Sequence, residues 1–354
     1  MAENQPFPRP NWITIRPRLL PISWRLDRRT PAILGVLFIA LAISLVMSVS
    51  YGEYNIAPLD VVRAVFGVET NDPNHILVVR SFRLPRILLS LLIGASLGAS
   101  GAIMQGITRN DLADPGILGI NTGAGVVVVA YVTFAAFPVN SLIPWLAFAG
   151  ALATSALIYG LSWKAGSSTL RLILIGVGVA SLGGAAISFL ITRMQIDRAQ
   201  QAYVWLTGSV YGSTWEEVQL MLTWLVVLLP ITFLSARQLN TMGLGDELTI
   251  GLGLRLEVQR FVLIALSSAL AAITVTVAGT IGFIGFVAPH IARRLVGPSH
   301  EGLLITTTVV GGLLMVISDL LARWVIAPSE LPIGVTTAII GAPYFAYLLY
   351  QRGR

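Results

Sequence analysis

Long apolar stretches, separated by short polar or Pro/Gly-rich breaks, make up most of this chain. The stretches reach about 20 residues, and at ~1.5 Å per helical residue that length crosses a hydrocarbon core of about 30 Å. They lack the alternation of apolar and polar residues that is typical of membrane β-barrels, so we expect helices. The pattern predicts ten transmembrane helices, near residues 31–50, 86–107, 117–137, 142–162, 171–192, 217–235, 259–279, 281–296, 303–322 and 332–350. The predicted fold is an all-α polytopic membrane protein, with a basic N-terminal tail at residues 1–30 and one ten-helix transmembrane domain at residues 31–354.

Composition supports this interpretation and excludes several kinds of site. The mean hydropathy is +0.79, and 55% of the residues are hydrophobic against 11% that are charged. Cysteine is absent, which excludes disulfides, thiolate metal sites and thiol catalysis. Lys164 does not follow a glycine as a Walker A loop requires, so we expect any ATP to be bound by another subunit. No small-residue cleavage pattern follows the first apolar run, which we therefore expect to stay in the mature chain.

The apolar stretch at residues 261–292 decides the number of crossings. As one helix it would be roughly 48 Å long, well beyond a core of about 30 Å, so a turn at Gly279, Gly282 and Gly285 is the alternative. With the turn, the side that holds the N-terminus has 16 of the 23 Lys and Arg residues, and the other side has 7. Without the turn the division is 13 to 10. The positive-inside rule therefore favours ten spans with both termini in the cytoplasm.

Charges inside the spans are confined to their ends. This argues against a proton- or sodium-coupled pump, in which intramembrane carboxylates carry the ion. Gly, Ala and Ser recur at three- and four-residue spacing in several spans, which is typical of closely packed helices, although some of these faces could line a pathway.

The remaining charges mark one candidate surface on each side. Arg80, Arg83 and Arg86 surround Pro85 at the predicted outer start of the second span, and Arg323 lies on the same side. They are either interfacial anchors or groups that bind carboxylates of a partner. On the inner side, the loop at residues 237–260 contains a short amphipathic segment, either a solvated loop or a surface for a cytoplasmic partner.

Several motifs together resemble one family, the FecCD-like permease subunits of ABC importers for ferric siderophores, cobalamin and haem. The matching stretches run from about residue 51 to the C-terminus in the family's order: RLPRILLSLLIGASLGASGAIMQGITRN, LADPGILGINTGAG, LGDELTIGLG, GTIGFIGFVAPHIARRLVG, SDLLAR and ELPIGVTTAIIGAPYFAYLL.

The resemblance implies a type II ABC importer permease bundle in the bacterial plasma (inner) membrane. It implies a second permease subunit, in a homodimer or a heterodimer, two cytoplasmic ABC ATPase subunits that bind ATP and Mg, and an extracytoplasmic substrate-binding protein. The chain is then a transporter subunit in a lipid bilayer and not an enzyme, with no cofactor or metal of its own and no nucleic-acid partner.

The resemblance also assigns residues to three roles. Binding-protein docking falls on Arg83, Arg86 and Arg323. The ATPase coupling loop falls on Leu244, Gly245, Asp246, Glu247, Gly251 and Gly253, and the cytoplasmic gate on Thr169 and Leu170, where the family's pair is more polar. Two further departures are Thr249, where the family has alanine in the coupling loop, and Asp111, where it commonly has proline.

Two other classes of function stay open at this stage. A secondary transporter or channel would work without ATP, and the absence of intramembrane carboxylates counts against it. An intramembrane enzyme would need a set of catalytic groups, but His75 on the outer side cannot meet His290 and His300 on the inner side across a core of about 30 Å. His290 is expected to pack or to hydrogen bond. The expected ligand is a ferric siderophore, with cobalamin and haem as alternatives.

Overall fold

Helices form nearly all of the regular structure in this computed structural model, which describes residues 12–15, 24–52, 54, 56–68, 70, 72, 74–135, 139–163, 169–327 and 329–352. The long helices are α1 (Thr30–Ser50), α4 (Leu84–Thr108), α5 (Ile120–Phe134), α6 (Ile143–Ser162), α7 (Thr169–Thr192), α9 (Trp215–Leu234), α12 (Leu256–Ala278), α13 (Ile284–Val296), α14 (His300–Trp324) and α15 (Ile333–Arg352). The shorter helices are α2 (Pro58–Phe66), α3 (Asn74–Leu77), the π-helix η1 (Val78–Arg83), the 3₁₀ helices η2 (Pro115–Leu118) and η3 (Asn140–Leu142), α8 (Ile196–Leu206), α10 (Ala236–Gly243) and α11 (Asp246–Gly251).

The ten spans expected from the apolar pattern each coincide with one long helix. Eight of the described helical segments have the length and hydropathy to cross a membrane, among them α3, η1 and α4, which run together as one segment of 35 residues. The other two, α5 and α13, are apolar but have only 15 and 13 residues. The all-helical membrane fold is therefore confirmed.

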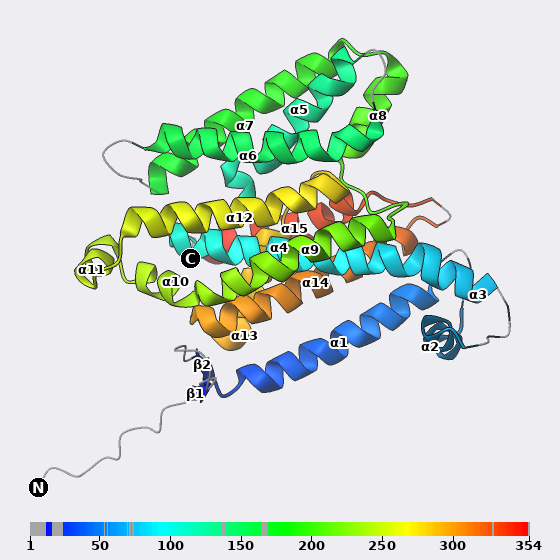
Figure 1. Ribbon diagram of the computed structural model, residues 1–354, viewed down its shortest axis with the longest axis horizontal. Coiled ribbons are helices and arrows are strands. Elements are labelled where there is room, and N and C mark those ends of the chain that lie inside the picture. Colours follow the sequence, from blue (N-terminus) through cyan, green and yellow to red (C-terminus); the bar gives the residue numbers. More distant parts are fainter. Residues whose placement is uncertain are drawn as a thin grey trace, which may run out of the picture.

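The helices run between two ends of the molecule (Figure 1). We call one the Arg323 end; it holds the C-terminal ends of α1 and α14, together with α2 and α3, at the right of Figure 1. We call the other the Asp246 end; it holds α10 and α11, at the left of Figure 1.

Helix α4 lies at the centre and contacts α14, α12, α13 and α9. Small residues allow this close approach, since a Cβ atom on Gly94 would collide with the carbonyl oxygen of Gly311 on α14. A Cβ atom on Gly101 would likewise collide with the carbonyl oxygen of Gly285 on α13. Of the most apolar stretch of the α4 segment 83% is buried, against 11% for α7, so α4 is the core helix and α7 a peripheral one.

The turn expected within residues 261–292 is present. Helix α12 ends at Ala278, and Gly279 follows with a φ of 68°, in the left-handed region that glycine adopts without strain. A Cβ atom there would also collide with the carbonyl oxygen of Trp205. Helix α13 then starts at Ile284 and returns toward the Asp246 end, so the long apolar stretch is two helices and not one.

The N-terminal tail contains one element that the sequence did not predict. Strands β1 (Trp12–Ile15) and β2 (Trp24–Asp27) pair antiparallel, with Trp12 opposite Asp27. This two-stranded ribbon contacts α14 and precedes α1 directly.

Candidate functional site

The three arginines expected at one docking surface lie together at the Arg323 end. Arg83, Arg86 and Arg323 line the same cavity of about 710 Å³, which is formed mainly by η1, α4, the start of α9 and the end of α14. The structure thus brings together residues that are up to 240 positions apart in the sequence. Their side chains are nevertheless largely buried, since 12% of the Arg86 side chain and 8% of the Arg323 side chain are exposed.

Two of these arginines cap the C-terminal end of α1. The last carbonyl groups of a helix have no partner within it, and α1 has no basic residue in its last turn. Arg83 donates to the carbonyl oxygens of Val49 and Ser50, and Arg323 donates to that of Ser48 at 3.0 Å. The guanidinium groups therefore fix the end of α1 to η1 and α14.

A buried carboxylate holds two of the arginines together. Asp319, whose side chain is fully buried, accepts from the Arg86 Nε at 2.8 Å and lies 3.0 Å from the Arg323 Nη2. Arg86 also donates through Nη1 to the Glu330 Oε2 at 2.8 Å. Because breaking a buried ion pair costs about 3–5 kcal/mol, these carboxylates stabilise Arg86 and Arg323 beside each other in one cavity.

Asp319 and Glu330 were not among the residues expected from the sequence. One local signal existed for Asp319, because it lies four residues before Arg323 and such spacing places two side chains on the same helical face. No local signal existed for Glu330, whose partner lies 244 residues away.

The expected coupling loop lies at the Asp246 end, where α10 ends and α11 begins. Gly245 adopts a φ of 114° and provides the sharp turn between the two helices. Asp246 then opens α11, and it is held by two arginines: the Arg109 Nη2 donates to its Oδ1, and the Arg260 Nη2 lies 3.2 Å from both carboxylate oxygens. Arg109 ends α4 and Arg260 belongs to α12, so Asp246 connects α11 to two long helices.

The charge state of Asp246 follows from these contacts. Partial burial acts to raise its pKa, but the hydrogen bond from Arg109 and the positive charge of Arg260 outweigh it, so the pKa of Asp246 lies below its ordinary value. The carboxylate is therefore ionised at neutral pH and can hold both guanidinium groups.

The opposite face of the loop is apolar and exposed. Leu244, Leu248, Ile250 and Leu252 are each 59–65% exposed, and Glu247 is exposed beside them. Exposed apolar patches of this kind are typical of surfaces that bind a partner. The loop thus has a charged inner face, directed at α4 and α12, and an apolar outer face.

The two departures from the family pattern have structural partners. Thr249 is fully buried, and its hydroxyl lies 2.6 Å from the Gly245 carbonyl oxygen and 3.0 Å from that of Thr241, which ties α11 to α10. Asp111 forms an ion pair with Arg293 of α13. The loop after α4 is thereby attached to α13 through a side chain.

The residues expected at the gate begin the peripheral helix α7. Thr169 is its first residue and Leu170, the second, is 68% exposed. The structure does not bring them to the docking or coupling residues, and residues 164–168 before them lie outside the described part of the chain.

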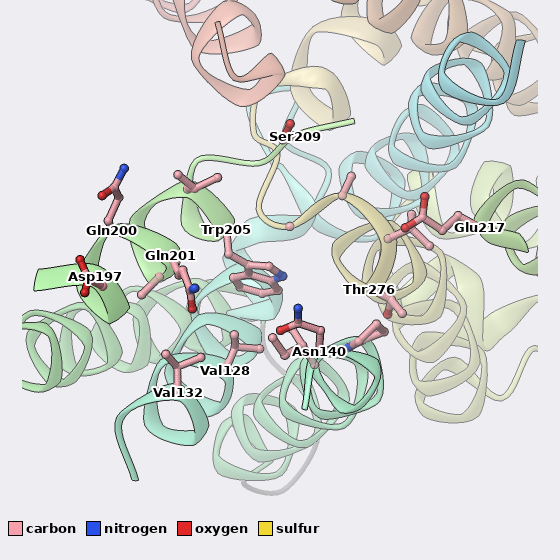
Figure 2. Close-up of a pocket in the computed structure, with 17 residues that line it drawn as sticks. Val128, Val132, Asn140, Asp197, Gln200, Gln201, Trp205, Ser209, Glu217 and Thr276 are labelled. Carbon is pink, nitrogen blue, oxygen red and sulfur yellow. The ribbon is translucent and has the colours of Figure 1, made fainter. Parts of the chain in front are cut away.

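A second large cavity, of about 710 Å³, lies between α5, α6, α8, α9 and α12 at the Arg323 end (Figure 2). Gln201 and Trp205 of α8 lie near Asn140, and Val128 and Val132 of α5 form an apolar wall. Asp197 and Gln200 of α8 lie at one edge of the cavity, and Glu217 lies at the other. The residues that line this cavity include two carboxylates and three carboxamides, and neither Lys nor Arg. Carboxamides both donate and accept hydrogen bonds, so this cavity favours neutral polar ligands over anions.

Histidines and carboxylates form no metal site in the described residues, where no group of three or more His, Cys, Asp or Glu is placed to hold an ion. His290 packs edge to face against Tyr344, with ring centroids 5.7 Å apart. The His300 Nδ1–H donates to the Asn240 Oδ1 at 2.8 Å, which ties the start of α14 to α10.

Comparison with known proteins gives one consistent family. Residues 40–351 match the FecCD transport family. The chain is 42% identical to the iron(3+)-hydroxamate import system permease protein FhuG of Bacillus subtilis (strain 168), over 90% of this chain and 96% of that protein. It is 40% identical to the cobalamin import system permease protein BtuC of Halobacterium salinarum, over 78% of this chain and 74% of that protein. A solved structure of an ABC transporter assigned to the metal-chelate type, in an inward-facing conformation, matches with a TM-score of 0.79 and 32% identity over 91% of this chain and 99% of the other.

Proposed function

The chain belongs to the FecCD transport family, and we propose that it is the permease subunit of an ABC importer that carries ferric siderophores across the bacterial plasma membrane. The observation that carries this proposal is the match over residues 40–351, together with 42% identity to a hydroxamate permease along almost its whole length. Transport and not catalysis is the activity of this family, so ATP and Mg belong to a partner ATPase.

All ten long helices cross the membrane in this proposal, with the Asp246 end in the cytoplasm. The distribution of cations supports the orientation, since the N-terminal side of ten spans carries 16 of 23. The turn at Gly279 supports the count, because α12 and α13 run in opposite directions from it. Helices α5 and α13 are too short to cross the membrane alone. We propose that the turns next to each helix, packed inside the protein, complete the crossing.

Two ATPase subunits bind at the cytoplasmic side, one on each permease subunit. The apolar outer face of α11 supports this surface, because more than half of the Leu248 side chain and of its apolar neighbours is exposed. Glycines at both ends of the segment, Gly245 and Gly253, have positive φ and give it the compact form of a separate short helix.

The loaded binding protein docks at the Arg323 end, outside the cell membrane. Arg86 and Arg323 line an open cavity there, and arginine binds carboxylates in a two-point geometry. The burial of these side chains changes the expected picture: a partner's carboxylate has to enter the cavity, since the guanidinium groups do not extend from the surface.

The pathway runs beside α7, at the interface with the second permease subunit. Helix α7 is the least buried of the candidate spans and exposes small residues, among them Gly178, Ser181 and Gly184. Thr169 and Leu170 stand at its cytoplasmic start, where a gate would close. ATP binding to the partner subunits would shift the bundle between its two states, and this requires two packings of similar free energy.

The polar cavity of Figure 2, which has no basic residue among those that line it, supports a hydroxamate-type complex as the ligand. A neutral iron complex rich in amide and hydroxamate groups matches its carboxamides, whereas polyanionic catecholate or citrate complexes meet two carboxylates there without a compensating cation among the lining residues. Cobalamin stays the second candidate because a cobalamin permease is among the relatives.

Uptake by reconstituted vesicles tests this proposal. The permease, its co-purifying ATPase and its binding protein are placed in proteoliposomes, and uptake of ferric hydroxamate, ferric citrate and cobalamin is measured with and without ATP. We expect ATP-dependent uptake of the hydroxamate complex. Uptake that proceeds without ATP would contradict the importer mechanism. ATP-dependent uptake of cobalamin alone would show that cobalamin, and not a ferric siderophore, is the ligand.

A further inference from the structure

Glu330 stands at the start of ELPIG, a motif whose role the proposed function leaves unexplained. It lies in the connection between α14 and α15, and it is one of the residues that line the cavity of the three arginines. Its carboxylate accepts from the Arg86 Nη1 at 2.8 Å. A carboxylate of this chain therefore occupies the position that a docking partner's carboxylate would need.

The two carboxylates bound to Arg86 differ in access. Asp319 binds the Arg86 Nε and its side chain is fully buried, while 30% of the Glu330 side chain is exposed. An approaching carboxylate cannot reach the Asp319 side of the guanidinium group, but it can reach the Glu330 side. The pair with Asp319 is therefore permanent, and the pair with Glu330 is the one open to exchange.

We propose that Glu330 is an internal competitor for Arg86, which the acidic surface of the binding protein displaces on docking. The proposal rests on the docking role of Arg86 given above and adds a regulated step to it. In the undocked transporter Glu330 neutralises Arg86. When an Asp or Glu of the partner forms the ion pair instead, Glu330 is released into the cavity.

Release of Glu330 acts on the connection that leads into α15. That connection is short, and a second contact, from the Leu331 N–H to the Ala322 carbonyl oxygen at 3.0 Å, ties it to α14. With Arg86 paired elsewhere, this backbone bond still ties the connection to α14. Helix α15 begins two residues later, at Ile333, so docking is transmitted to α15 through loss of one side-chain contact.

Glu330→Gln tests the competition directly, because the amide keeps the size of the side chain and removes its charge. The assembled transporter is reconstituted in nanodiscs and the dissociation constant of its binding protein is measured. We expect about fivefold tighter binding, the value of one partly exposed ion pair. We also expect higher ATPase activity without binding protein, since the ion pair between Glu330 and Arg86 is then already absent.

Glu216→Gln is the matched control. Glu216 is an exposed carboxylate on the first turn of α9, next to residues that line the same cavity, so its loss makes the same change in surface charge. We expect its effect on the dissociation constant to stay within about twofold. Equal tightening in both variants would overturn the proposal, because it would show a general effect of charge.

Two further variants separate the possible outcomes. Arg86→Gln removes the docking arginine, while Asp319 keeps its pair with Arg323. Unchanged affinity in the assembled variant contradicts the docking role, whatever Glu330 does. Glu330→Asp keeps the charge and should bind the partner with an affinity between the parent and Glu330→Gln. If both Glu330 variants bind the partner with unchanged or weaker affinity, or if both fail to assemble, Glu330 is a structural residue and the proposed competition is wrong.

Discussion

The two ends of the central helix α4 carry the same arrangement of charges in different surroundings. At the Arg323 end, Arg86 of α4 and Arg323 of α14 share Asp319. At the Asp246 end, Arg109 follows α4 and shares Asp246 with Arg260 of α12. In each cluster one aspartate joins α4 to a second long helix.

Burial of the shared aspartate distinguishes the two clusters, although Arg260 is buried as well. The Asp319 side chain is fully buried, whereas 45% of the Asp246 side chain is exposed. Breaking a buried pair leaves an uncompensated charge and costs about 3–5 kcal/mol, while an exposed pair contributes about 0–1 kcal/mol. The cluster at Asp319 is therefore suited to hold helices in place, and the cluster at Asp246 to let a loop move.

The surfaces around the two clusters also differ, because one is polar and the other apolar. At the Arg323 end, polar groups line cavities that open to the surface, which suits an exchange of ion pairs with a partner that comes and goes. At the Asp246 end, apolar side chains of α11 project outward, which suits a permanent partner. The comparison agrees with the proposal of a transient partner at one end and a stable partner at the other.

Asp319→Asn should have the largest effect. The substitution leaves the guanidinium groups of Arg86 and Arg323 without their buried counter-charge, and we expect a loss of about 3–5 kcal/mol in stability, enough to prevent assembly. The measurement is the yield of folded transporter and its thermal unfolding in detergent. Asp197→Asn, at an exposed position on α8, is the control and should leave both unchanged. A stable, assembled Asp319→Asn variant would mean that the buried ion pairs of Asp319 contribute little to stability, and that burial does not give the two clusters different roles.

Leu248→Asp should come next, with an effect on one partner only. A charge in the middle of the apolar face of α11 should weaken binding of the ATPase subunit about 30-fold, the loss typical of a central interface residue. Co-purification and the dissociation constant of the ATPase measure this. Leu248→Met keeps the surface apolar and should bind normally. Normal ATPase binding by Leu248→Asp would remove α11 as the site of the stable partner.

Much of the fold was predictable because lipid imposes a simple rule on the chain. Apolar stretches of about 20 residues located the long helices, and the charge count located the turn at Gly279 within a stretch that has no charge to mark it. The ribbon of β1 and β2 was not predictable, since no such rule applies to a short Pro-rich tail.

The charged clusters were only partly predictable, because their members come from distant segments. The pair of Arg86 with Asp319 joins residues 233 positions apart, and that of Arg109 with Asp246 joins residues 137 apart. The sequence indicated that arginines gather at one end, but it gave no sign that internal carboxylates already bind them. Thr249 and Asp111 likewise looked like defects of a pattern, until their contacts with Thr241 and Arg293 showed what each side chain does.

Asp246→Asn should have the smallest effect, and it tests whether the exposed cluster transmits motion. The amide keeps α11 and its apolar face in place, so the ATPase should still bind, but the charge that ties α11 to Arg109 and Arg260 is lost. Because an exposed pair contributes about 1 kcal/mol or less, we expect a twofold to fivefold fall in the number of ligand molecules transported per ATP hydrolysed. Simultaneous measurement of uptake and phosphate release in proteoliposomes gives this ratio. Glu247→Gln changes the adjacent, exposed carboxylate and should lower the ratio less than Asp246→Asn does, whereas Arg109→Gln should lower it as much. If Glu247→Gln lowers the ratio to the same extent, the loop responds to surface charge in general, and the cluster at Asp246 has no special part in coupling.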